Sequence, residues 1–312
     1  MSRAVLLAAA LAGLLGGTVV AEPPARRPSP AGEMSIVFVG DIMLDGGPGH
    51  AIATGHDPFA ATAELLVDGD YTVGNLECVL GGEGSQVLKP YTFRAAAAAP
   101  RHLARYFTAV SLGNNHAYDF GPEGLAGTLA ELAAVGVRQV GGGTLAEARR
   151  PLVLEKDGLR VAILAANGFR PEESAATADR PGVAPLAAEA FLADIAAARR
   201  EADLVVPFVH WGPECVAQPD EADRRLARRM IDAGAGVVIG GHPHVTQTVD
   251  VYRGAPIVYS LGNFVFDYFP GDPAEWTGWV VRLMVRKDRP VEIETTAVVI
   301  DPVGLPRPAG DE

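Results

Sequence analysis

The sequence predicts an α/β fold, because three patterns hold along the chain. Short apolar runs rich in Val and Ile alternate with amphipathic stretches of helical period. Most of the apolar runs are bounded by Gly, Asp or Asn, and no internal repeat interrupts the alternation. Such alternation is typical of βαβ units, which form a largely parallel sheet with helices on its faces. We therefore expect one domain over residues 34–302, followed by a short frayed tail at 303–312.

The individual elements follow from the same patterns. Strands are predicted at the apolar runs, which are residues 35–40, 71–75, 107–112, 160–165, 203–210, 236–241, 256–262, 279–285 and 292–300. Helices are predicted at residues 121–136, 185–202 and 219–235. In these three stretches apolar residues recur at helical spacing, and each stretch ends at Gly or just before a strand.

Two segments precede the predicted domain. Residues 1–21 combine an early cation, Arg3, with an apolar run and with Val19 and Ala21 at the positions that a signal peptidase reads. This pattern predicts a cleaved secretory signal peptide. An uncleaved membrane anchor is the alternative, because the run approaches bilayer-spanning length. Either way we expect export to the periplasm, the cell envelope or the outside. Residues 22–33 are Pro-rich and polar and are predicted to be a linker.

Charge and cysteine content narrow the function classes. The formal net charge is −12, and Lys and Arg cluster only in short pairs such as Arg228-Arg229. A nucleic-acid partner is therefore not expected. The two cysteines, Cys78 and Cys215, are too few for a disulfide scaffold. They either lie near each other as a disulfide or reactive pair, or are two small buried apolar residues.

Polar side chains follow five of the predicted strands at the points where these strands end. The functional site of an open α/β sheet forms outside the carboxyl ends of its strands. The side chains found there are Asp41, Asn75, Glu77, Asn115, His116, Asp119, His210, His242 and His244. Any one of them could be a helix cap or a turn residue. Together their carboxylates, carboxamides and imidazoles predict a site for a divalent metal.

Three motifs give these residues more specific roles. In GHPH, an extended backbone stiffened by Pro243 would send His242 and His244 to the same side. In SLGNNHAYDFG, Asn115 offers a metal an uncharged oxygen, while His116 can donate a proton with its tautomer fixed by Asp119. Arg94 in YTFR could clamp a substrate carboxylate or phosphate, with a surface salt bridge as the alternative.

With these motifs the chain resembles the bacterial CapA family of poly-γ-glutamate capsule synthesis, within the calcineurin-like metallophosphoesterases. The motifs run in order from Ser35 to Asp267 as GDIML, GNLE, YTFR, SLGNNHAYDFG, PFVHWGPE, GGHPHVTQ and YSLGNFVFD. The resemblance implies a four-layer αββα sandwich with a metal centre on the loops above its sheets.

The NHAYDFG stretch is also similar to the 5′-nucleotidase branch of that superfamily. There the matching Asn binds metal, and the matching His and Asp form the proton-transfer pair. This similarity implies that Asn115 is a ligand and that His116 and Asp119 are catalytic. The ligands implied by the other motifs are Asp41, His210, His242 and His244.

Two positions depart from the superfamily pattern. Met43 stands where the first motif has His, and Asn75 stands where the second has a bridging Asp. If Asn75 faces the metal, one bridging anion is lost, whereas Glu77 in that place would restore the charge. We therefore expect one or two divalent ions, with Mn, Zn, Fe and Mg all open as the metal.

Two kinds of function remain after these arguments. One is a metal-dependent, phosphoesterase-like hydrolase or transferase at the cell envelope, in which the metal activates water and His116 protonates the leaving group. An exported phosphatase or nucleotidase would share this site. The other is a non-catalytic subunit that handles an anionic polymer. The sequence has no P-loop, so polymer ligation would belong to partners such as membrane-bound capsule synthase subunits.

Overall fold

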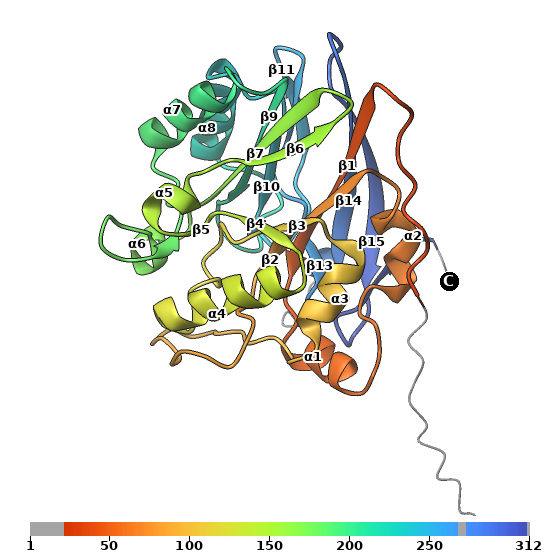
Figure 1. Cartoon of the computed structure of the whole chain (residues 1–312), viewed down its shortest axis with the longest axis vertical. Coiled ribbons are helices and arrows are strands. Elements are labelled where there is room, and N and C mark those ends of the chain that lie inside the picture. The colour runs from red at the N-terminus through yellow and green to blue at the C-terminus, as the bar shows by residue number, and fades with distance from the viewer. Residues whose placement is uncertain (1–21, 268–272, 311–312) are drawn as a thin grey trace, which may run out of the picture.

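The computed structural model describes residues 22–267 and 273–310, and their main elements are two β-sheets with helices around them (Figure 1). The strands of the first sheet are β1 (Glu33–Ile42), β2 (Tyr71–Leu76), β3 (Ala109–Ser111), β4 (Arg138–Val140), β13 (Asn263–Val265), β14 (Thr277–Arg286), β15 (Glu292–Ile300) and β16 (Pro306–Pro308). The strands of the second sheet are β6 (Leu152–Lys156), β7 (Leu159–Asn167), β9 (Leu204–His210), β10 (Val238–Gly241), β11 (Val249–Tyr252) and β12 (Ala255–Val258). A small separate sheet pairs β5 (Gly142–Gly143) with β8 (Gly182–Val183).

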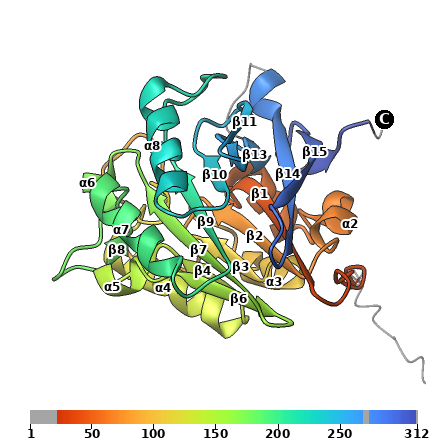
Figure 2. The same cartoon turned by 90° about the horizontal axis from the view of Figure 1, so that it is seen from above.

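The helices lie on the outer faces of the two sheets. They are α1 (Gly46–Ala53), α2 (Ala63–Leu66), α3 (Ala99–Tyr106), α4 (Gly121–Ala134), α5 (Leu145–Ala148), α6 (Pro171–Ser174), α7 (Ala188–Ala198) and α8 (Glu221–Asp232), with 3-10 turns at Ala60–Thr62 and Pro273–Trp276. Figure 2 shows α7 and α8 on one side of the molecule and α2 and α3 on the other, with both sheets between them.

Three apolar cores separate these layers. Alternation along β1 buries Ile36 and Phe38 between the sheets, where they join Phe208 of β9, and sends Val37 and Val39 toward the helices of the first sheet. The opposite face of the second sheet packs on α7 and α8. Four layers around three cores confirm the α/β class and the αββα sandwich.

Both sheets are mixed rather than largely parallel. The first has the order β16-β15-β14-β1-β2-β3-β4, with β13 also pairing β1, and the second has the order β11-β12-β10-β9-β7-β6. Strands β1 to β4 run parallel, and so do β7, β9, β10 and β12, whereas β14, β15, β16, β6 and β11 pair antiparallel. Short turns permit these antiparallel pairs, as between β6 and β7, where Asp157 and Gly158 both have positive φ.

The predicted linker and tail are both part of the fold. Ahead of β1, the Arg26 guanidinium donates to Thr72 Oγ1 at 2.8 Å and to the Tyr106 carbonyl at 2.6 Å. After β15, the Asp301 carboxylate accepts from the backbone N–H groups of Val303 and Leu305, both at 2.9 Å. This turn brings β16 back against β15, so the expectation of a frayed tail was wrong for residues 303–310. Residues 22–32 form no helix or strand, and the linker stays a prediction. Composition cannot show that such polar segments have partners elsewhere in the fold.

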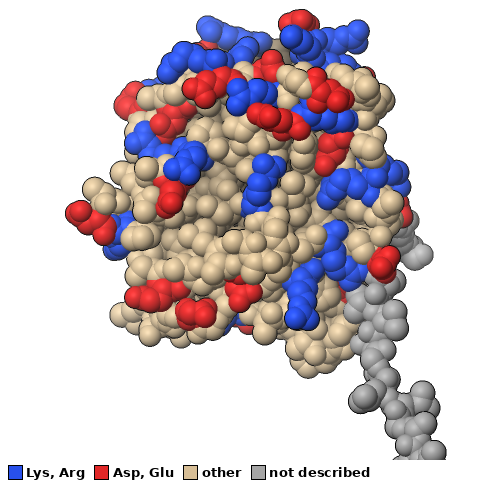
Figure 3. Space-filling view, viewed as in Figure 1, with Lys and Arg blue, Asp and Glu red and all other residues tan. Residues whose placement is uncertain are grey.

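The signal peptide or anchor predicted for residues 1–21 lies outside the described residues. Within residues 22–267 and 273–310, no helix is long and apolar enough to cross a bilayer. On the face shown in Figure 3, basic and acidic side chains are interspersed along the upper edge, and the centre carries little charge.

Candidate metal centre

The carboxyl ends of strands from both sheets meet at one edge, where most of the predicted ligands converge. The first sheet supplies oxygen donors, and the second supplies the imidazoles of His210, His242 and His244. Asp41, Glu77 and His242 have no exposed surface, and His210 and His244 are almost fully buried. The geometric prediction that distant side chains meet at one rim is therefore confirmed.

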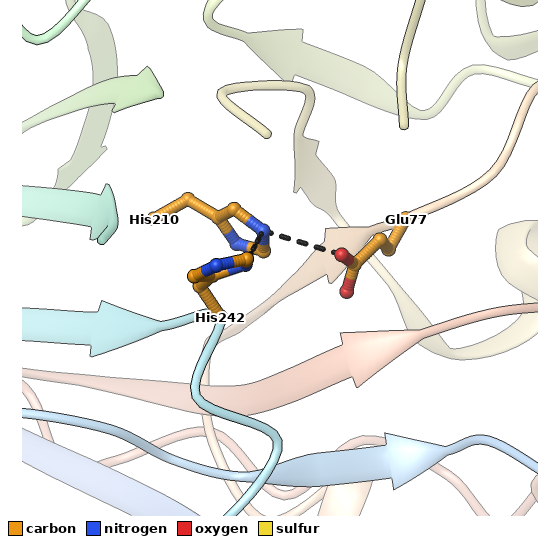
Figure 4. Close-up of side chains that lie close together, drawn as sticks. All are labelled: Glu77, His210 and His242. Atoms are coloured by element: carbon orange, nitrogen blue, oxygen red, sulfur yellow. Dashed lines mark hydrogen bonds and ion pairs between the residues drawn. The ribbon is translucent and has the colours of Figure 1, made fainter. Parts of the chain in front are cut away.

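One group of donor atoms centres on the Nε2 of His210. Asn115 Oδ1 lies 2.8 Å from this atom, His242 Nδ1 lies 3.0 Å from it, and Glu77 Oε1 lies 3.2 Å from it. In Figure 4, Glu77, His210 and His242 point toward one another from the ends of three strands. Donor atoms around a tetrahedral ion with bonds near 2 Å lie about 3.3 Å apart, so these spacings suit a small divalent cation.

The hydrogen bonding of Glu77 supports the same conclusion. Among the described residues, both of its carboxylate oxygens are buried and accept no hydrogen bond. An unpaired buried carboxylate is costly, because it has lost water without gaining a donor. A cation held by Glu77 and the two imidazoles would remove that cost.

Glu77, rather than Asn75, faces this group of donors. The Asn75 amide donates to Asp41 Oδ1 at 2.8 Å, and its oxygen accepts from the Asn114 side chain at 3.0 Å. A reversed Asn75 amide would place its oxygen against the Asp41 carboxylate, so the network fixes its orientation. Asn75 therefore orients Asp41, and it meets the Nδ1 of His210 through its amide nitrogen, at 3.2 Å, not through an oxygen. Glu77 places a carboxylate oxygen beside the Nε2 of His210.

A second group of donors shares the Glu77 carboxylate. Donor atoms of Asp41, Glu77 and His244 lie within 4.8 Å of one another. The Nδ1 of His244 is 3.4 Å from Asp41 Oδ2 and 2.9 Å from Asn263 Oδ1. Met43 adds no ligand here, since its sulfur accepts from the Asp45 N–H at 3.1 Å. The second group therefore has fewer well-placed donors than the first.

The pKa values of these residues reflect their burial. Burial, reinforced by the Glu77 carboxylate, raises the pKa of Asp41 to about 7, and burial raises the pKa of Glu77 well above its usual range. Burial lowers the pKa of His210 to about 4 and that of His244 to about 3. The imidazoles are thus held in the neutral form that binds metals, beside two carboxyl groups whose pKa values are raised.

The GHPH segment reaches the site with a different backbone from the one expected. His242 has φ 95° and His244 has φ 58°, so neither residue is extended. Positive φ is rare for side chains of this size and marks a locally strained turn. The two rings still lie together, with centroids 5.8 Å apart. The expected pairing of the rings is confirmed, but its explanation by extended backbone was wrong.

The predicted proton-transfer pair forms beside this cluster. His116 Nδ1 lies 2.8 Å from Asp119 Oδ2, which also accepts from the Phe93 N–H at 2.7 Å. Lys89 forms an ion pair with the other oxygen of Asp119 and donates to the Asn115 carbonyl at 2.9 Å. The contact with Asp119 thus fixes the His116 tautomer through Nδ1.

Arg94 and the cysteines do not sit as the sequence suggested. The Arg94 guanidinium donates to the carbonyls of Gly81 and Glu83 at 2.7 and 2.8 Å and stacks on the Phe120 ring. These contacts hold a loop and leave few donors for a substrate. No disulfide joins Cys78, which is buried, to Cys215, which is exposed. Burial raises the pKa of Cys78, so its thiol is unreactive.

Three residues at the site were missed by sequence reasoning. Asn263 pairs with Asp41 in the sheet, and Lys89 approaches Asp119 from a loop. Glu214 lies on the open side, with Oε1 4.0 Å from His242 Nε2. Asn263 had a signal, because Gly-Asn follows an apolar run in VGN, SLGNN and YSLGN alike. Lys89 and Glu214 had none, because each reaches the site from a loop.

Comparison with known proteins identifies the family. The model of the family described as "Bacterial capsule synthesis protein PGA_cap" matches residues 35–268. The "PGA biosynthesis protein CapA" of Bacillus subtilis is 35% identical over 258 residues, covering 79% of this chain and 67% of that protein. The "Capsule biosynthesis protein CapA" of Bacillus anthracis is 32% identical over 247 residues, covering 75% of this chain and 60% of that protein. The chain thus spans about two thirds or less of the length of these relatives.

Solved structures share the fold at low sequence identity. A putative 5′-nucleotidase from Staphylococcus aureus superposes with a TM-score of 0.54 and 15% identity, over 90% of this chain and 55% of that one. A 5′-nucleotidase precursor from Thermus thermophilus superposes with a TM-score of 0.53 and 14% identity, over 88% of this chain and 56% of that one. These neighbours confirm the metallophosphoesterase fold, and the family match shows that this chain belongs to the bacterial capsule synthesis family PGA_cap.

Proposed function

We propose that this protein is a metal-dependent hydrolase or transferase that acts on a phosphoester or a related anionic substrate during capsule polymer synthesis at the cell envelope. The single observation that carries the proposal is the convergence of Glu77, His210 and His242, with both Glu77 oxygens buried and without hydrogen bonds. The names of the relatives support the capsule context.

The chain's own residues divide the chemistry between them. Glu77, His210, His242 and Asn115 would hold one divalent cation, and Asp41 and His244 would hold a second one with Glu77 shared. Such a cation supplies Lewis acidity, which polarises a substrate oxygen and makes water a better nucleophile near neutral pH. His116 would give a proton from Nε2 to the leaving oxygen, while Asp119 holds Nδ1. The ion pair with Lys89 keeps Asp119 in place.

The test measures metal content and turnover of the full chain loaded with Mn²⁺ or Zn²⁺, with bis(p-nitrophenyl) phosphate as a model diester. We expect His116→Gln to keep its metal and to lose about 10²- to 10⁴-fold in turnover, the usual contribution of a general acid. A wild type that binds no metal, or turnover unchanged by His116→Gln, contradicts the proposal.

His102→Gln is the matched control for this test. His102 is as buried as His116 and also contacts an aspartate, with Nδ1 3.4 Å from Asp57 Oδ1, but it belongs to α3. Its replacement should leave the turnover of the folded protein unchanged.

A second candidate function is a non-catalytic subunit that handles polymer in a capsule synthase complex. The observation that favours it is Met43, whose sulfur turns to Asp45 and leaves the second cation position with few donors. Complementation of a deletion strain with an Asp41→Asn, His242→Ala double variant separates the candidates. Full recovery of capsule would favour polymer handling, and loss of capsule by a stably folded variant would favour chemistry.

A further inference from the structure

The end of β7 adds a wall to the metal centre. Asn167, the last residue of this strand, pairs with His210 in the sheet, and the N–H of Gly168 donates to the His210 carbonyl at 2.7 Å. The Phe169 ring then lies on the His242 ring, with centroids 4.2 Å apart. The segment that follows β7 is therefore fixed beside two of the proposed metal ligands.

One buried side chain sets the position of Phe169. The Asn167 amide donates to the Phe169 carbonyl at 2.9 Å, and its oxygen accepts from the Phe169 N–H at 3.0 Å. Asn167 itself is fully buried. Because both backbone polar groups of Phe169 are bound by one rigid side chain, the ring is held in place before any ligand arrives.

Arg170 extends from this ring into solvent. Its guanidinium carbon lies 5.5 Å from the Phe169 ring centroid, and its side chain is 59% exposed. Its backbone has φ 41°, a left-handed conformation that costs energy for a residue with a side chain and that often occurs at functional sites. Its ionic contact, with Glu173 at 3.7 Å, is also exposed and therefore weak.

Unlike Arg170, the other charged side chains described close to the cluster are either already paired or negatively charged. Lys89 is already paired with Asp119 and with the Asn115 carbonyl. Glu214 adds negative charge near the Nε2 of His242. Arg170 thus brings a positive charge that no buried carboxylate neutralises, one aromatic ring away from a proposed metal ligand.

We propose that Phe169 and Arg170 form a specificity corner, in which Phe169 positions the guanidinium and Arg170 binds an anionic substituent next to the reacting bond of the substrate. The planar guanidinium can give two parallel hydrogen bonds to a carboxylate or a phosphate, which share this recognition chemistry. The inference rests on the proposed function, because it names the substrate chemistry of the same site.

The experiment titrates the Mn²⁺-loaded full chain with inorganic phosphate and, separately, with glutarate, by isothermal calorimetry. We expect Arg170→Gln to raise the Kd of at least one anion by about tenfold, the loss expected for a charge-assisted hydrogen bond. Arg170→Lys should recover part of that affinity, because it restores the charge but not the planar fork. The anion that is weakened identifies phosphate or carboxylate as the recognised group.

Arg253→Gln is the matched control. Arg253 also follows an aromatic residue, has φ 51°, and places its guanidinium carbon 5.4 Å from the Tyr252 ring centroid, but it lies in the turn between β11 and β12. Its replacement should leave both Kd values unchanged. Equal anion affinities in wild type and Arg170→Gln, or no anion binding by the wild type, overturn the inference.

Metal content, measured in every variant, keeps the two proposals apart. A wild type without metal contradicts the proposed function. Full metal content with anion binding independent of Arg170 contradicts only the specificity corner.

Discussion

The two ends of strand β2 carry buried carboxylates in opposite circumstances. At the amino end, Asp70 accepts from the Ser35 N–H at 2.8 Å and lies 2.7 Å from the Lys156 ammonium. At the carboxyl end, Glu77 accepts no hydrogen bond and faces imidazoles and another carboxylate. One acid is satisfied by the fold, and the other accepts no hydrogen bond among the described residues, which is why we propose that it holds a cation. The difference separates a buried charge that the fold satisfies from one that the proposed function uses.

The pKa values of Asp70 and Glu77 shift in opposite directions. Burial would raise the pKa of Asp70, but its contacts with Lys156, Ser29 and Ser35 outweigh that effect and lower it. Burial raises the pKa of Glu77 far more than Lys89 can oppose. Replacing the carboxyl group by an amide should therefore lower the stability of the protein at Asp70 but not at Glu77.

The largest expected effect is on cation affinity. Glu77→Gln should weaken Mn²⁺ or Zn²⁺ binding by more than about 100-fold, because changes in residues that only orient a ligand already cost about 10- to 100-fold. Asn75→Ala should fall within that smaller range, and Asp70→Asn should have no effect. Calorimetric titration of the chelator-treated proteins measures all three. Equal losses of cation affinity in Asn75→Ala and Glu77→Gln would contradict the assignment of Glu77 as the ligand.

The next effect is on stability without metal. In excess chelator at pH 7, Asp70→Asn should lower the free energy of unfolding by about 2 kcal/mol, because it leaves the Lys156 ammonium without its partner. Glu77→Gln should leave that free energy unchanged or raise it by about 1 kcal/mol, because it removes an acid that has no donor. Urea denaturation measures both values. Destabilisation by Glu77→Gln as large as that by Asp70→Asn would show that the protein satisfies both acids.

The smallest expected effect is the pH dependence of the stability that Asp70 provides at the amino end of β2. Because the folded protein lowers the pKa of Asp70, the stability that this acid provides is fully present above its unfolded pKa of about 4. That stability is lost as the pH falls through the lower folded pKa. The difference in unfolding free energy between wild type and Asp70→Asn should thus shrink by about 1 kcal/mol between pH 6 and pH 3. A difference that grows on acidification would contradict this assignment.

The strand pattern predicted much of the fold and of the site. Runs such as 35–40 and 204–210 are buried on both faces, so their apolar character was visible in the sequence. The polar residues that follow them lie at one edge. The antiparallel strands β14 to β16 were not recognised as such, because strand direction depends on turns and pairing rather than on composition. The tail was misjudged for the same reason, since Pro306–Pro308 is a strand only beside β15.

Within the site, the sequence could not decide between Asn75 and Glu77. Residues two apart in a strand point to the same side, so alternation treats them alike. What separates them is side-chain length and the Asn114 amide, which binds the Asn75 oxygen. Lys89 and Glu214 were missed because their contacts with Asp119 and His242 exist only after the chain has folded.

The Arg26 contacts determine where a fusion or tether can leave the domain. Arg26 is bound to Thr72 near the start of β2, whereas Glu77 follows the end of the same strand. A tag, linker or lipid anchor joined ahead of Arg26 would thus emerge away from the candidate metal centre. An N-terminal surface tether is accordingly the natural choice for assays of this protein with large polymers.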